Sequence, residues 1–161
     1  MKQKKVLILT LTAIFRAGLI FWLGTTNNPS SQQANLSENA IEVVMYKNAG
    51  CLCCDKWASY LEEQGYDVAI EESMNTNAIK DEHHVPGTMR SCHTALIDGY
   101  VVEGHVPVED INRLLSERPE IVGITAPGMP ASAPGMNTEL NTPYDVYQFD
   151  KEGNTKLYSS H

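Results

Sequence analysis

The feature that most constrains this chain is a group of three cysteines within four residues, Cys51, Cys53 and Cys54. The group follows an apolar run at residues 41–46, which predicts a strand, and it opens a pattern with helical spacing. A helix N-terminus stabilises anions and lowers the pKa of a thiol placed there. A thiol cluster at such a junction can therefore bind a soft metal ion or exchange disulfides.

The first 24 residues predict an export segment. Lys2, Lys4 and Lys5 form a basic start, and two apolar runs separated by Arg16 follow. We therefore predict a signal peptide or membrane anchor at residues 1–24, a polar linker at 25–40 and a folded domain at 41–161. Any association with a membrane would involve only the N-terminal segment.

The charge distribution argues against nucleic acid as a partner. The formal net charge is −8, and every acidic residue lies after residue 34, whereas four of the 12 basic residues precede it. Neutralising phosphates requires clustered Lys and Arg, which the folded part lacks. Phosphate-binding glycine loops, nucleophile elbows and HExxH motifs are also missing, so the enzyme classes that these motifs mark have no support.

The remaining pattern predicts an α/β fold with a mixed sheet flanked by helices. A helix should follow the cysteines, because Cys54, Trp57 and Leu61 share one face, and it should end near Gly65. Further predicted elements are a strand at 66–70, a helix at 75–82, a hairpin at 92–97 and 100–103, a helix between Pro107 and Pro119, and a terminal hairpin at 144–150 and 155–159. This order is that of a thioredoxin-like core, with two parallel strands and an antiparallel hairpin at the edge.

The donor residues favour copper among the metals. Thiolates and thioethers are soft donors that select Cu(I), whereas a zinc finger spaces its cysteines more widely. The candidate ligands are Cys51, Cys53, Cys54, Cys92, His105, Met129 and Met136. The two methionines end Ala-Pro-Gly-Met units that recur within residues 126–136. His93 is left out, because alternation along a strand would point it away from Cys92.

Two other functions stay open. In an oxidising compartment four cysteines can pair in three ways, although a bond between the neighbours Cys53 and Cys54 would be strained. A pair formed by Cys51 and Cys54 would suit a thiol–disulfide oxidoreductase, so enzyme activity is undecided. Two structural bridges would instead suit a disulfide-stabilised interaction module.

Five segments together resemble a bacterial family that includes the CopG-type copper-resistance proteins and was long catalogued as a domain of unknown function. The segments are Gly-Cys-x-Cys-Cys-x-x-Trp at 50–57, Val-Pro-Gly at 85–87, Ser-Cys-His-Thr-Ala at 91–95, Gly-Tyr-x-x-Glu-Gly-His-Val-Pro at 99–107 and the Pro-Gly-Met repeat at 127–136. The resemblance covers about residues 41–150. It implies a periplasmic, thioredoxin-like protein whose cysteines hold a cluster of Cu(I) ions for copper resistance or homeostasis. Its partners would be copper ions and other periplasmic copper-handling proteins.

Overall fold

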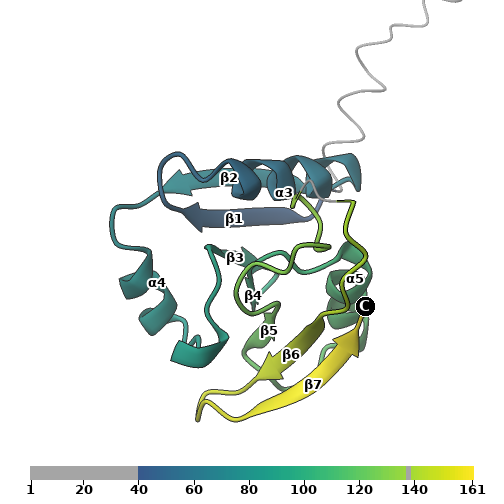
Figure 1. The fold of residues 1–161 in the computed structure, drawn as a ribbon. Helices are drawn as coiled ribbons and strands as arrows, with labels where there is room; N and C mark the ends of the chain where they lie inside the picture. The colour runs from purple at the N-terminus through teal and green to yellow at the C-terminus, as the bar shows by residue number, and fades with distance from the viewer. Residues whose placement is uncertain (1–39, 137–138) are drawn as a thin grey trace, which may run out of the picture. The chain divides into compact units, whose positions relative to one another are not determined.

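The computed structural model describes residues 40–136 and 139–161, which form a seven-stranded sheet and three α-helices (Figure 1). In chain order the elements are β1 (Glu42–Lys47), α3 (Leu52–Glu63), β2 (Asp67–Glu72), α4 (Thr76–Glu82), a 3-10 turn (Gly87–Met89), β3 (His93–Ile97), β4 (Tyr100–Glu103), α5 (Val108–Glu117), β5 (Gly123–Thr125), β6 (Asp145–Phe149) and β7 (Thr155–Ser160). The predicted export segment lies outside the described residues. No helix of the described part is both long and apolar enough to cross a membrane.

The strands pair in the order β2-β1-β3-β4-β5-β6-β7. α3 connects the parallel strands β1 and β2, and β3 runs antiparallel to both β1 and β4. The turn between β3 and β4 is Asp98-Gly99, and both residues have positive φ, as a tight two-residue hairpin requires. The mixed α/β fold is thus confirmed, while its assignment as thioredoxin-like stays a prediction.

β5 was not predicted from the sequence, so the expected place of the 100–103 strand at the edge of the sheet is wrong. β5 pairs in parallel with β4, and the predicted terminal hairpin continues the sheet as β6 and β7. All three residues of β5 are buried, and so short a run shows no periodicity. Gly123 is needed there, because a Cβ would collide with the backbone of Val101.

The helix after the cysteines forms as predicted. Its buried residues are Cys54, Trp57, Ala58 and Leu61, which share one face. Gly65 follows its end with φ of +91°, a left-handed conformation that glycine adopts without strain. The Trp57 indole donates to the Val106 carbonyl at 2.9 Å, so the large side chain is buried with its polar atom satisfied.

The helices cover both faces of the sheet. α3 and α5 share the main core with side chains of β1, β3 and β4, including Met45, Ile97 and Val102. α4 lies against the other face, where its Lys80 contacts Thr94 of β3. Successive strand residues point to opposite faces, so the residues that start β3 can contact groups on either side.

Candidate metal centre

Three of the four cysteines belong to the start of α3. The chain turns from β1 into the helix at Gly50, whose φ of +76° lies in the left-handed region. Cys51 is the N-cap residue, and its carbonyl accepts the amide hydrogen of Cys54 at 3.1 Å. Cys53 and Cys54 therefore lie in the first turn. Cys51 and Cys53 are half-buried, and Cys54 is fully buried.

An ion-pair brace fixes this turn to the sheet. Lys47 ends β1, is only 3% exposed, and places its Nζ 2.9 Å from Asp55 Oδ1 of α3 and 3.1 Å from Glu72 Oε1 of β2. The hydrogen bond to Asp55 is the largest cause of a raised Lys47 pKa. The ammonium thus stays charged and holds the first turn of α3 against the ends of β1 and β2.

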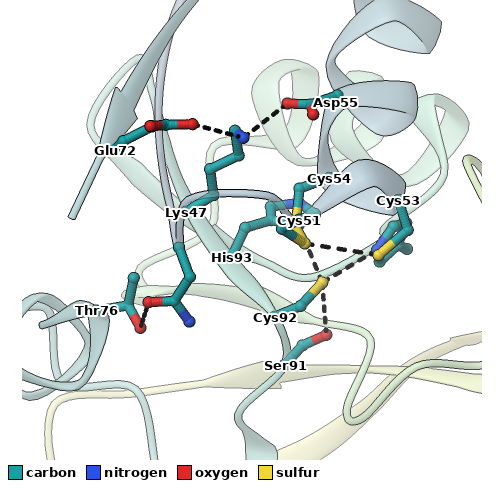
Figure 2. The surroundings of a disulfide bond; sticks show 12 residues. Lys47, Cys51, Cys53, Cys54, Asp55, Glu72, Thr76, Ser91, Cys92 and His93 are labelled. Carbon is teal, nitrogen blue, oxygen red and sulfur yellow. Dashed lines mark hydrogen bonds and ion pairs between the residues drawn. A yellow bond between two sulfur atoms is a disulfide. The ribbon is translucent and has the colours of Figure 1, made fainter. Parts of the chain in front are cut away.

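The four cysteine sulfurs form one cluster (Figure 2). Their Sγ atoms all lie within 4.8 Å of one another. Of the pairings open to the sequence, only Cys51–Cys54 is formed as a disulfide among the described residues, and Cys53 and Cys92 are free thiols. Cys53 Sγ lies 3.6 Å from Cys51 Sγ. The structure therefore brings together all four predicted cysteine ligands, with two of them oxidised.

Cys92 reaches the cluster through strand pairing. It directly precedes β3, whose first residue lies opposite Lys47 of β1. This strand lies beside β1, to which it pairs in antiparallel. Burial, and next the nearby Cys53, raises the pKa of the Cys92 thiol from 9.0 to about 11. Cys92 is therefore a neutral thiol at neutral pH and must lose a proton before it can bind a metal as a thiolate.

His105 is a buried imidazole directed at the same cluster. Its Nδ1 lies 2.6 Å from the Pro134 carbonyl, which can only accept, so Nδ1 carries the proton. The Nε2 lone pair is then left facing Cys92 Sγ, 3.1 Å away. Burial lowers the pKa of His105, which keeps the ring neutral. A carbonyl that fixes the tautomer of a metal-binding histidine is a common outer-shell arrangement.

Comparison with known proteins identifies the family. A family model described as "protein of unknown function, DUF411" matches residues 89–136, which hold Cys92 and His105 but not the three cysteines of α3. No curated protein matches. Two solved structures, of forms 1 and 2 of the copper resistance protein CopG, share 36% identity and a TM-score of 0.72 with this chain, covering 76% of it and 98% of their own length. The chain belongs to the CopG copper-resistance family.

In this CopG-family chain His93 lies beside Cys92, contrary to the prediction from the sequence. The side chain was predicted to point away from Cys92, yet its Nδ1 lies 3.4 Å from Cys92 Sγ. The alternation rule does not apply to this pair, because β3 begins only at His93. The ring packs between Trp57 and His105, and its Nε2 has no hydrogen-bond partner among the described residues. Burial, and next His105, lowers its pKa well below the usual value.

The Pro-Gly-Met repeat crosses the cluster as a strap, here defined as residues 126–136. Ser91, next to Cys92, forms an isolated parallel bridge with Gly128 of the first repeat. The second repeat supplies the Pro134 carbonyl to His105. Its Gly135 packs against α3 so closely that a Cβ would lie 2.8 Å from the Trp57 amide nitrogen. The backbone of both repeats is thus attached beside the cluster.

The two methionines of the strap differ in exposure. Met129 is 61% exposed, whereas Met136 is half-buried. The strap brings their backbones to the site, but ligation by either thioether sulfur stays a prediction. A soft sulfur on the exposed side of a thiol cluster would suit an ion that is held first by thiolates.

The donor set of the CopG-family site fits copper. It consists of four sulfurs and two imidazoles, grouped as Cys51, Cys53, Cys54 and Cys92 in one set and Cys92, His93 and His105 in another. Hard cations such as Ca²⁺ and Mg²⁺ prefer oxygen ligands, whereas thiolates and imidazoles suit copper. The donor groups and the CopG relatives together support a copper-related role.

Proposed function

We propose that this protein binds Cu(I) through a shared shell of the thiolates of Cys51, Cys53, Cys54 and Cys92, and that it serves copper resistance or homeostasis in the periplasm. The observation that carries the proposal is the convergence of all four Sγ atoms within 4.8 Å. His105 supports it, because its neutral Nε2 faces Cys92 Sγ, one of these four sulfurs. Copper is cargo in this proposal, and the protein need not catalyse a reaction.

We further propose that more than one Cu(I) is held. Four ionised thiolates in a half-buried site carry four negative charges, and one Cu(I) would leave three of them uncompensated. Uncompensated charge away from water is strongly unfavourable. Sulfurs that bridge several cations spread this charge. Met129 and Met136 would complete the coordination from the strap and limit access of oxidants.

Loading requires a reductant. The Cys51–Cys54 disulfide must accept two electrons, which break the S–S bond and leave two thiolates. A dithiol can supply these electrons and becomes a disulfide itself. Protein reduced by a dithiol should therefore bind more Cu(I) than untreated protein, in which only Cys53 and Cys92 are free thiols.

The test is an anaerobic titration of the reduced protein with Cu(I) against a competing chelator. More than one tightly bound Cu(I) per chain supports the proposal, and Cys92→Ser should lower that number. Binding of one copper or none by the reduced wild type would reject the multinuclear site. Metal analysis of protein purified without oxygen gives an independent count.

A second function is favoured by the disulfide itself. A Cys-x-x-Cys disulfide at the N-terminus of α3 suits thiol–disulfide exchange through Cys51 and Cys54. The sheet order β2-β1-β3-β4, with α3 joining two parallel strands, supports our proposal that this part is thioredoxin-like. Copper-free turnover of a disulfide substrate, lost in Cys51→Ser, would favour the oxidoreductase. Two bridges in the oxidised protein would favour the interaction module.

The proposed location depends on residues 1–24, which lie outside the described residues. Fractionation of cells that express the full chain tests it, since a periplasmic protein is released with the outer compartment. A protein that begins at Asn35 should fold and bind copper like the full domain. Loss of folding in that shortened protein would show that the N-terminal segment is structural and would weaken the assignment to export.

A further inference from the structure

A buried ion pair lies on the α4 face of the sheet, outside the donor groups of the metal centre. Glu103 of β4 is 0% exposed and Lys80 of α4 is 3% exposed, and their Oε1 and Nζ atoms are 2.6 Å apart. The desolvation of two such charges can exceed their attraction, so an ion pair of this kind is weak evidence for stability. The contacts of the Glu103 carboxylate indicate a role for this ion pair other than stability.

The Glu103 carboxylate accepts hydrogen bonds from three directions. Oε1 accepts the Ser91 amide hydrogen at 2.6 Å in addition to Lys80, and Oε2 accepts the Thr94 hydroxyl at 2.6 Å. Lys80 also donates to Thr94 Oγ1 at 3.0 Å, so that hydroxyl must direct its hydrogen to Glu103. Burial raises the pKa of Glu103 and Lys80 opposes this. An arrangement in which every partner donates is that of an ionised carboxylate.

The amide held by Glu103 belongs to the residue directly before Cys92. On the other side of Cys92, the Gly104 amide donates to the His93 carbonyl at 3.0 Å. The consecutive residues Glu103 and Gly104 therefore bind the backbone on both sides of Cys92. His105 follows in the same segment and places its Nε2 3.1 Å from Cys92 Sγ. The hydrogen bond from Ser91 to Glu103 thus joins the segment of Cys92 to the segment of His105.

We propose that Glu103 is a positioning residue of the metal centre: it holds Cys92 in register with the other sulfurs and with His105 by accepting the Ser91 amide hydrogen. Lys80 balances its charge, which allows a carboxylate to occupy a fully buried position. The inference rests on the proposed copper binding and assigns a part in it to a residue that is not itself a ligand. Thr94 orients the second carboxylate oxygen.

The test compares two double variants, each of which removes both charges of the ion pair. Lys80→Met/Glu103→Met removes the acceptor for Ser91, whereas Lys80→Met/Glu103→Gln keeps an amide oxygen that can accept the same hydrogen. We expect both proteins to fold, because apolar replacement of a buried ion pair is often neutral or stabilising. The Met/Met protein should lose roughly 10- to 100-fold in Cu(I) affinity, the range seen for outer-shell partners. The Met/Gln protein should stay within about threefold of wild type, a change smaller than any in that range.

A double-mutant cycle separates positioning from general damage. In a Cys92→Ser background the Met/Met replacement should have no further effect on affinity, because the ligand through which Glu103 acts is already absent. An equal loss in both backgrounds, or wild-type affinity in the folded Met/Met protein, overturns the inference. If the Met/Met protein does not fold, Glu103→Asp decides. It keeps a carboxylate charge that the flexible Lys80 side chain can follow, but the shorter side chain withdraws from the Ser91 backbone amide. Wild-type affinity in this variant would overturn the inference. Failure of the wild type to bind Cu(I) would reject the proposed function instead.

Discussion

Proton release on copper binding is the prediction that the structure defines most sharply. The Cys92 thiol has a pKa of about 11, so at pH 7 nearly every molecule carries its proton. Cu(I) bound by the Cys92 thiolate must displace this proton. Because the pKa is raised, the affinity of the Cys92-dependent copper should increase as pH rises, by about tenfold per pH unit below the thiol pKa.

The comparison of wild type with Cys92→Ser isolates this proton. Serine keeps the size of the side chain but has no ionisable thiol, and its effect on the free energy of unfolding should be on the order of 1 kcal/mol or less at this half-buried position. Anaerobic titration of both reduced proteins with Cu(I) in weak buffer counts the protons released. The variant should release about one proton fewer per chain at saturation. Equal proton release, or a Cys92→Ser affinity with the wild-type pH slope, would refute Cys92 as a thiolate ligand.

Three further outcomes follow from the strap and the disulfide. Met129→Ala/Met136→Ala should weaken Cu(I) affinity or speed air oxidation of the loaded protein without changing the stoichiometry, whereas Met74→Ala, at a methionine 96% exposed and outside the strap, should do neither. Gly135→Ala should lower the free energy of unfolding by more than Gly128→Ala. Both have positive φ, worth roughly 1–2 kcal/mol of strain, but only the Gly135 methyl would meet the α3 backbone; equal losses in denaturant titrations would contradict the close packing of the strap. Mass spectrometry after alkylation should find two free thiols in untreated protein and four after dithiol treatment, and four without treatment would remove the need for a reductant.

The local elements were predictable because their signals are local. The buried face of α3, its end just before Gly65 and the Asp98-Gly99 hairpin each depend on residues a few positions apart. The cysteine group at the start of α3 was visible for the same reason, and the structure confirms its place on the helix. β5 could not be predicted, because its three residues are recognisable as a strand only when β4 and β6 lie on either side.

The residue types of the site were also readable from the sequence, since soft donors are uncommon and here occur in short motifs. The sequence offered Cys92, His105, Met129 and Met136 as candidate ligands without their distances. It could not choose among the cysteine pairings. In the structure Cys51 and Cys54 are bonded, because the first turn of α3 brings them within reach, with 5.4 Å between their Cα atoms.

Tertiary structure alone decided which distant groups meet. The antiparallel pairing of β1 and β3 carries Cys92 to the cysteines of α3, and the return of the chain through β4 places His105 against Cys92. The orientation of His93 and the contact of Glu103 with Ser91 likewise depend on strand registers that no local pattern specifies. The sequence by itself determined the soft donors and the helix that presents three of them. The sheet determined where the fourth sulfur, the two imidazoles and the Glu103 carboxylate lie relative to those donors. Long-range hydrogen bonding between strands fixes these distances, which spacing along the chain does not.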